Sequence, residues 1–436
     1  MTKRIRKALE FPRCKGREVV AAFDGGAVTS DAGVLLLRQA DRKLGLLAQV
    51  AKRLKDARDP GRVMHTQLSM LRQRVYGIAL GDEDLNDHDT LRNDLALQTA
   101  VDRAEPLASA PTLCRLENSA ERETARAISE VLVEQFIASF EQPPQEIVLD
   151  FDATDDPVHG EQEGRFFNGF YNEYCFLPLY VFSGKQLLVA YLRPASRGAA
   201  HHAGAILKLL VRKLRAIWPA VRIVFRGDSH FCTPRILGYC DRDGVDYIVG
   251  LAKNKRLNTL AGATLAEAAR RFAKTARKAR LFTGFRYATR NWKRKRRVIA
   301  RIEHDAQGSN PRYVVTSLTG KGRALYERVY CARGEMENRI KEQLQLFSDR
   351  TSCHEWWPNQ FRLLLSSLAY TLLETIRRLG LQGTELARAK VSTIRLKLLK
   401  IGAVIIRNTR RVRFLLSSAY PHQDLFRRVA ENLAPS

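Results

Sequence analysis

The feature that most constrains the fold is a change in hydrophobic periodicity near residue 146. From there to residue 252, short apolar runs of strand length alternate with two helix-like segments, 203–218 and 234–243. The strand-like runs are 147–153, 175–182, 186–192, 221–226 and 246–251, which gives the order β-β-β-α-β-α-β. Because such alternation packs helices against a mixed sheet, the sequence predicts an α/β domain here.

The regions on either side of this domain have helical periodicity. Residues 1–142 are predicted to be mostly helical, and a Pro-Pro pair after Gln142 indicates a boundary. Helical patterns return from residue 322 and continue to the end of the chain. Since 436 residues exceed what one core usually holds, we expect three regions, 1–142, 143–365 and 366–436.

The charge of the chain points to an anionic partner. Lys and Arg number 73 against 46 Asp and Glu, a formal charge of +27. Residues 253–300 hold 16 Lys or Arg and one acid, and the densest run is Trp292-Lys-Arg-Lys-Arg-Arg. Nucleic acid is the commonest partner of so basic a protein, although a generally basic proteome or a membrane-surface role would also account for the charge. Trp292 could stack on an unpaired base or simply fill the core.

Two of the predicted strands end in acidic residues. Asp150 and Asp152 point to the same face because strand side chains alternate. Asp228 follows a second apolar strand, within Arg226-Gly-Asp-Ser. Two carboxylates on one face are unfavourable without a cation between them, and hard divalent ions prefer such oxygen ligands. The ordinary explanations are a solvated strand end for the first pair and a helix cap for Asp228.

A later helix carries a row of polar side chains. Tyr330, Arg333, Glu337 and Lys341 follow i, i+3, i+4 spacing and so share one face of the segment 322–347. The opposite stripe is apolar, so the helix can bury that stripe and present the polar row to a site. The alternative is a solvated face with weak ion pairs between successive turns.

Taken together, these motifs resemble the DDE transposases of bacterial insertion sequences, in the subgroup with a Tyr-x2-Arg-x3-Glu signature. Tyr330, Arg333 and Glu337 match that signature, and Asp228 matches the second Asp of the family in Arg-Gly-Asp-Ser. Asp152 matches the first, with Asp150 as the alternative. The Lys expected six residues after the Glu is absent, since residue 344 is Leu, and Lys341 lies one turn after Glu337 instead.

The resemblance implies a ribonuclease-H-like mixed-sheet catalytic core over 143–365, with a basic β-rich insertion at about 253–313 and helical regions on both sides. It implies cleavage at insertion-sequence ends and strand transfer by two Mg²⁺ ions, which Mn²⁺ can replace, about 3.5–4 Å apart. Asp152, Asp228 and Glu337 would be the catalytic carboxylates and metal ligands, supported by Asp150, Tyr330, Arg333 and Lys341. The residues expected to contact DNA are Arg226, Trp292, Lys293, Arg294, Lys295, Arg296 and Arg297.

The expected partners are the terminal inverted repeats, bound by region 1–142, the target DNA and a second copy of the chain in a synaptic complex. Seven cysteines without a paired spacing, and no apolar run of spanning length, indicate a reducing compartment and no membrane. We therefore expect a cytoplasmic bacterial protein at the nucleoid. Two alternatives remain: a metal-dependent nuclease without strand transfer, and a basic DNA-binding protein without catalysis.

Overall fold

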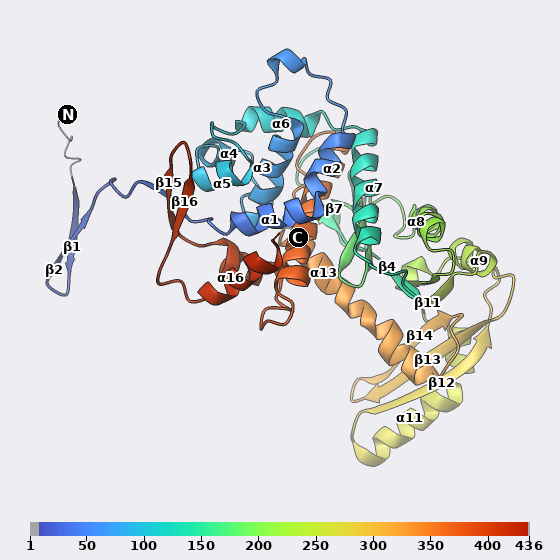
Figure 1. The fold of residues 1–436 in the computed structure, drawn as a ribbon. Coiled ribbons are helices and arrows are strands. Elements are labelled where there is room, and N and C mark those ends of the chain that lie inside the picture. The colour runs from blue at the N-terminus through green and yellow to red at the C-terminus, as the bar shows by residue number, and fades with distance from the viewer. Residues whose placement is uncertain (1–7, 435–436) are drawn as a thin grey trace, which may run out of the picture. The chain divides into compact units, whose positions relative to one another are not determined.

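The computed structural model describes residues 8–434. The chain forms two compact units, which are considered separately below (Figure 1). The sheet unit comprises residues 120–367, and the helical unit combines residues 1–119 with 368–436. The two ends of the sequence thus belong to one unit, whereas the sequence suggested separate terminal regions with boundaries at 142 and 365.

An eight-stranded mixed sheet forms the centre of the sheet unit, in the order β12-β13-β14-β11-β10-β4-β8-β9. Its core strands are β4 (Glu146–Ala153), β8 (Leu179–Ser183), β9 (Gln186–Tyr191), β10 (Arg222–Gly227) and β11 (Asp246–Leu251). Two helices, α8 (Ala203–Ile217) and α9 (Pro234–Arg242), connect β9, β10 and β11. The predicted order β-β-β-α-β-α-β is confirmed for these elements, and so is the mixed α/β class.

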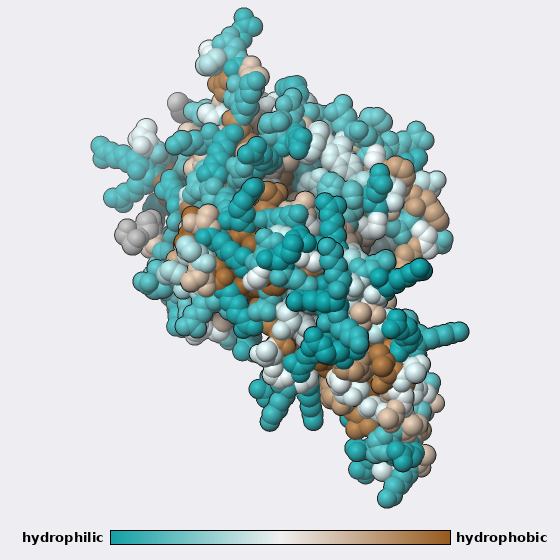
Figure 2. Space-filling model, turned by 90° about the vertical axis from the view of Figure 1, so that its right-hand side faces the viewer, coloured by the Kyte–Doolittle hydropathy of each residue, from teal (hydrophilic) through white to brown (hydrophobic). Residues whose placement is uncertain are grey.

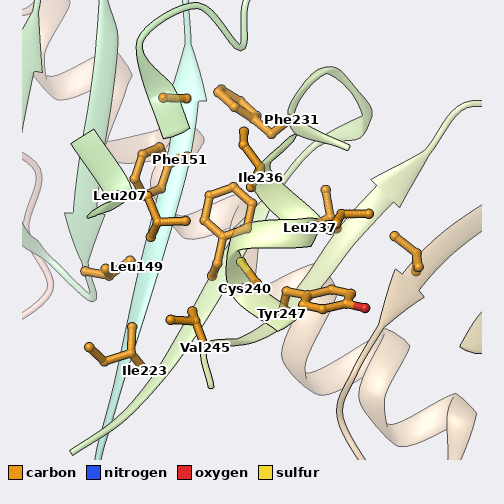
Figure 3. Packing of buried hydrophobic residues seen from close by; sticks show 14 of the residues in the cluster. Leu149, Phe151, Leu207, Ile223, Phe231, Ile236, Leu237, Cys240, Val245 and Tyr247 are labelled. Carbon is orange, nitrogen blue, oxygen red and sulfur yellow. The ribbon is translucent and has the colours of Figure 1, made fainter. Parts of the chain in front are cut away.

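One face of this sheet packs against the connecting helices. Leu149 and Phe151 of β4 meet Leu207 of α8 and Leu237 of α9 in a single apolar cluster (Figure 3). The rings of Phe151 and Phe225 lie edge to face, 5.0 Å apart. Since successive strand residues point to opposite faces, this packing directs the residues between them to the other side of the sheet.

The basic segment after β11 extends the same sheet. Three antiparallel strands, β12 (Ala279–Tyr287), β13 (Arg296–Asp305) and β14 (Gly308–Thr316), join it through β14 and β11. They are preceded by α10 (Lys255–Leu260) and α11 (Gly262–Thr275), so the expected β-rich insertion begins with helix. The alanine-rich stretch 261–273 explains this difference, because alanine has the highest helix propensity.

A small second sheet interrupts the chain between β4 and β8. It consists of β5 (Asp156–Pro157), β6 (Phe166–Asn168) and β7 (Glu173–Phe176), in the order β5-β7-β6. The single strand predicted over 175–182 is therefore wrong. Pro178 lies at the break between β7 and β8, where it cannot donate a backbone hydrogen bond to a sheet.

The predicted helix over 322–347 is one helical run with irregular turns. It comprises α12 (Gly322–Ala324), a π-helical segment η3 (Leu325–Tyr330), a 3₁₀ turn η4 (Cys331–Arg333) and α13 (Gly334–Leu344). Met336 and Ile340 of α13 are buried, as the predicted apolar stripe requires. The unit also contains α7 (Arg122–Ala138), the short turn η2 (Ser229–Phe231) and the first part of α14 (Trp356–Thr375).

The helical unit contains strands that the sequence did not predict. An exposed hairpin, β1 (Leu9–Cys14) with β2 (Arg17–Ala21), precedes β3 (Ala27–Thr29). β3 pairs with β15 (Ala403–Arg407), which pairs with β16 (Val412–Leu416). The flanking regions, predicted to be mostly helical, therefore also contain strands. β3 is only three residues long and finds its partner almost 380 positions away, beyond the reach of a local pattern.

Helices make up the rest of this unit. From the N-terminal segment come α1 (Val34–Leu44), α2 (Leu46–Arg53), η1 (Pro60–Arg62), α3 (Gln67–Leu80), α4 (Asp87–Leu91), α5 (Leu95–Ala100) and α6 (Ala110–Asn118). From the C-terminal segment come η5 (Ile376–Gly380), α15 (Val391–Ile394), η6 (Arg395–Leu399) and α16 (Gln423–Asn432). A Cβ at Gly33 would lie 2.0 Å from the carbonyl oxygen of Leu398, so only glycine lets these two segments approach so closely.

Hydrophilic side chains cover much of the surface shown in Figure 2, as the charge composition leads one to expect. Across residues 8–434, none of the helices combines the length and apolar character that crossing a membrane requires.

Candidate active site

The face of the sheet opposite α8 and α9 carries the predicted acidic residues. In the parallel pairing of β4 and β10, Asp150 is in register with Arg226. Asp152 lies two residues further along β4, and Asp228 directly follows β10. The structure thus places Asp152 and Asp228 at the carboxyl ends of two neighbouring parallel strands. The prediction that Asp150 and Asp152 share a face is confirmed, since the intervening Phe151 packs on the other side.

Asp150 is held in a buried ion pair. Both of its carboxylate oxygens accept hydrogen bonds from the Arg226 guanidinium, with an Nη2–Oδ2 distance of 2.6 Å and a second short bond from Nε. Arg226 also donates from Nη1 to the carbonyl oxygen of Val329 in η3. Arg226, expected to contact DNA, is therefore buried and links three segments, namely β4, β10 and the helical run that carries Tyr330 and Arg333.

Asp152 has a different environment. Its Oδ2 accepts a hydrogen bond of 2.8 Å from Arg333 Nη2. Burial raises the pKa of Asp152 to about 6; the Arg333 charge opposes this shift, and the nearby Asp228 charge adds to it. A buried carboxylate next to a second carboxylate is the arrangement that a bound cation would stabilise.

Asp228 begins a tight turn at the end of β10. Its Oδ1 accepts a hydrogen bond from the His230 backbone nitrogen at 2.9 Å, and its Oδ2 lies 2.8 Å from His230 Nδ1. Gly250 of β11 lies directly behind this turn. A Cβ there would lie 2.7 Å from the Ser229 nitrogen and 2.8 Å from the Tyr330 hydroxyl oxygen, so glycine is required for this close packing.

The polar row on the later helix reaches the strand ends through Arg333. The guanidinium of Arg333 contacts Asp152 and also lies 3.3 Å from Glu337 Oε1. Tyr330 is partly buried; burial raises the pKa of its hydroxyl to about 12, and Arg333 opposes this shift. The Glu337 side chain is 53 % exposed, and Lys341 is exposed on the next turn. The Arg333 guanidinium thus lies between the carboxylates of Asp152 and Glu337 and contacts both.

The acidic side chains at the strand ends match a divalent ion in part. Asp152 and Asp228 supply the hard oxygen donors that Mg²⁺ prefers, and the buried Asp152 carboxylate lies near the Asp228 charge, which a cation would offset. Over the described range 8–434, no group of three or more His, Cys, Asp or Glu side chains has the arrangement of a metal site. The two aspartates therefore fit the ion in donor chemistry, while Arg333 stands between them and Glu337.

The basic run 292–297 lies away from the acidic strand ends. β13 runs in the same direction as β4, β10 and β11, because β14 is antiparallel to both β11 and β13. The turn before β13 is therefore at the edge where the parallel strands begin. In agreement, Arg294 and Arg296 both pair with Asp241 of α9, the helix that precedes β11.

Several residues of this run have structural roles. Trp292 is 8 % exposed and packs against Tyr287, with Arg296 over its ring at 5.0 Å, so the core-filling alternative accounts for it. Arg297 donates to the carbonyl oxygens of Leu318 and Gly320. Lys293 and Lys295 are exposed and remain candidates for a phosphate contact.

Two residues beside the acidic strand ends were missed from the sequence. His230 contacts Asp228, and the Asp-x-His spacing was a visible signal for it. Tyr171 is the second; burial raises the pKa of its hydroxyl to about 12, and the charges of Asp155, Asp152 and Asp228 add to that shift. No sequence signal identified Tyr171, because it lies in a loop 19 positions after Asp152.

Comparison with known proteins agrees with this geometry. No curated protein matches the chain. The family described as transposase DDE domain group 1 matches residues 11–436, almost the entire chain. Together with the acidic ends of β4 and β10 and the helix that faces them, this match shows that the chain belongs to the DDE-domain transposase family.

Proposed function

We propose that this protein is a transposase of the insertion-sequence type, which cuts the ends of its element and joins them to target DNA with two divalent metal ions. One observation carries the proposal: Asp152 and Asp228 lie at adjacent strand ends, and Arg333 connects Asp152 to Glu337. The family match supports a transposase role for this arrangement.

Asp152, Asp228 and Glu337 are the proposed metal ligands. Bound Mg²⁺ or Mn²⁺ would activate the attacking water or 3′-hydroxyl and stabilise the leaving oxygen. Asp152 is favoured over Asp150 as the first ligand, because both oxygens of Asp150 are already engaged by Arg226. Asp150 and Arg226 are instead assigned a positioning role, which holds the two strands and the helical run in place.

Arg333 and Tyr330 are the proposed contacts to the reacting phosphate. The planar guanidinium of Arg333 matches two phosphate oxygens, and its present partners are the carboxylates beside which the phosphate must lie. A phosphate that engages Arg333 would leave the Asp152 and Glu337 oxygens available to a cation. Lys341 lies one turn beyond Glu337 and would meet the DNA backbone further from the cut.

Recognition of DNA is proposed to involve both units. The exposed Lys293 and Lys295 would contact phosphates at a distance from the cut, since they lie at the opposite edge of the sheet. The N-terminal part of the chain is proposed to bind the terminal repeats, and a dimer is proposed to pair the two ends.

The test uses the purified full-length protein with labelled DNA carrying the sequences that flank its gene, in Mg²⁺ or Mn²⁺. Cleavage, strand transfer and DNA binding are measured for wild type and for Asp152→Ala, Asp228→Ala and Glu337→Ala. Glu335→Ala is the matched control, because Glu335 is an exposed acid on the same helix that pairs with Arg339.

We expect the three variants to bind DNA normally and to lose cleavage and strand transfer, while Glu335→Ala retains both. Cleavage that survives one of the three substitutions would remove that residue from the site. Cleavage without joining of a 3′-hydroxyl end would identify a nuclease, and binding without any cleavage by wild type would identify a non-catalytic DNA-binding protein.

A further inference from the structure

A hairpin rich in exposed aromatic residues lies between the first two core strands of the sheet unit. It is formed by β6, β7 and the turn between them, and is called the aromatic hairpin (residues 166–176) below. Phe170 at the turn is 78 % exposed, and three further rings of this hairpin are about half exposed: Phe166, Phe167 and Tyr174. Exposed apolar groups that gather in this way usually mark a binding surface.

The hairpin holds these rings in a defined arrangement. Phe167 and Tyr174 pack edge to face at 5.6 Å, and the guanidinium of Arg165 lies 4.8 Å from the Tyr174 ring centre. Asn168 organises the turn: its Oδ1 accepts from the Phe170 nitrogen at 3.0 Å, and its carbonyl oxygen accepts from the Asn172 nitrogen at 2.7 Å. The turn therefore presents Phe170 to solvent by its own hydrogen bonds.

The exposed ring lies next to the acidic strand ends. The ring centres of Phe170 and His230 are 6.3 Å apart, and His230 contacts Asp228 at 2.8 Å. Phe170 also packs edge to face on Tyr171 at 4.9 Å. Phe170 therefore lies beside the turn that carries Asp228, with only the His230 ring between them.

The burial of Asp152 favours an unpaired strand. Asp152 is only 7 % exposed, so a cation held by its carboxylate, and the phosphate on that cation, would lie below the surface. A single strand can bend toward such a buried group, but an intact duplex brings its second strand and paired bases with it. Separation of the strands leaves a base without its stacking partner, and an aromatic ring can replace that partner.

We propose that the aromatic hairpin binds an unpaired nucleobase beside the phosphate that is cut, with Phe170 stacking on the base and Arg165 and Tyr174 flanking the strand. This inference rests on the proposed DNA cleavage at Asp152 and Asp228. It adds a base-binding site formed by a segment between β4 and β8, separate from the helical run that carries Tyr330 and Arg333.

The experiment compares two DNA probes that share one strand, which carries a 2-aminopurine near its end. The second strand is complementary throughout in the duplex and mismatched over the last two bases in the fork, where the 2-aminopurine is left unpaired. Binding is measured by fluorescence anisotropy and stacking by quenching of 2-aminopurine, for wild type, Phe170→Ala, Phe170→Trp and Leu209→Ala. Leu209 is the control, because it is an exposed apolar residue of the same unit on α8, outside the site.

Wild type is expected to bind the fork about tenfold more tightly than the duplex and to quench 2-aminopurine. Phe170→Ala should reduce fork binding to the level of the duplex and abolish quenching, while Phe170→Trp and Leu209→Ala keep both. The proposal is overturned if Phe170→Ala retains the preference for the fork or weakens duplex binding equally. It is also overturned if the variant changes only self-association measured by light scattering, which would identify a protein-binding surface.

Cleavage of the same fork in Mg²⁺ is scored separately. If the wild-type protein prefers the fork but does not cleave it, the proposed function is contradicted and the base-binding proposal is retained. Cleavage by wild type without a preference for the fork would contradict the base-binding proposal alone.

Discussion

At the residue scale, two aspartates on one face of β4 have opposite relations to their neighbours. Asp150 is neutralised by Arg226 through two hydrogen bonds, whereas Asp152 shares its surroundings with Asp228. The first arrangement stabilises the fold only while both partners are present. The second holds a buried carboxylate whose charged partner Arg333 also contacts Glu337, and which lies near the Asp228 charge, an arrangement that a cation would stabilise.

Substitution of Asp150 and Asp152 should therefore separate stability from activity. Asp150→Ala leaves the buried Arg226 charge unpaired and is expected to cost about 3–5 kcal/mol in the free energy of unfolding. Asp152→Asn removes a buried charge and should leave that free energy equal or higher, while cleavage is lost. Urea unfolding of both variants measures this, and an equal loss of stability would contradict the different roles assigned here.

A second acid, Asp156, should make stability depend on pH. Burial raises the pKa of Asp156 to about 7; the hydrogen bond from Thr351 opposes this shift, and the charges of Asp349 and Asp155 add to it. In the unfolded chain the same carboxyl has a pKa near 4. The folded state therefore binds an extra proton between about pH 4 and pH 7, so stability falls as pH rises across that window.

Asp156→Asn should remove this dependence, because the amide is neutral at every pH and still offers an oxygen to the Thr351 hydroxyl. The difference in unfolding free energy between variant and wild type, measured from pH 5 to pH 8, should grow in favour of the variant by on the order of a few kcal/mol. A constant difference would show that Asp156 titrates normally in the folded protein.

At the element scale, the acidic site depends on how closely three segments pack at the end of the sheet. Gly250 of β11 lies behind the Asp228 turn and against the Tyr330 hydroxyl, and Arg226 ties β10 to the Val329 carbonyl. These contacts position Asp228 and the helical run relative to β4. A change in the spacing between these elements should thus alter the site without touching a carboxylate.

Gly250→Ala should test this spacing. The added methyl group would overlap the Ser229 nitrogen and the Tyr330 oxygen, and overpacking of this kind costs about 1–3 kcal/mol. We expect a protein that still folds, with cleavage reduced at least tenfold. Gly284→Ala in β12 is the matched strand control, since its nearest neighbour would be 3.5 Å away. Equal activity of the two variants would contradict the close packing at Gly250.

At the scale of the whole molecule, we expect the formal charge of +27 to dominate the proposed interaction with DNA. Phosphate contacts release counterions, so binding should weaken steeply with salt. Not every basic side chain is available to contact phosphate, because Arg294 and Arg296 pair with Asp241, and Arg226 pairs with Asp150. Counting basic residues in the sequence therefore overstates the number of phosphate contacts.

The exposed lysines of the turn before β13 allow a direct measurement. The double variant Lys293→Ala/Lys295→Ala should bind duplex DNA more weakly and reduce the slope of log K against log salt by about 1 per lost contact. Lys185→Ala/Lys208→Ala, which removes two lysines of the same unit outside the basic insertion, controls for the change in total charge. An unchanged slope in the first variant would exclude this turn from the DNA interface.

The sequence by itself determined the order of the core strands and helices and the candidate carboxylates. Both rest on local patterns. Apolar runs indicate which segments are buried, and the Asp-rich strand ends and the Tyr-Arg-Glu spacing can be recognised from neighbouring residues in the chain. The shared face of Asp150 and Asp152 follows from strand geometry alone. Local pattern also suggested, correctly, that β10 ends next to an acidic residue.

Tertiary structure decided what each of those residues contacts. The register of β4 with β10 pairs Asp150 with Arg226, which converts a candidate ligand and a candidate DNA contact into a buried ion pair. The direction of β13 places the basic run at the far edge of the sheet, and β3 pairs with β15 across most of the chain. Such facts depend on contacts between distant segments, which no local periodicity encodes, because pairing is fixed only when the whole sheet and its core assemble.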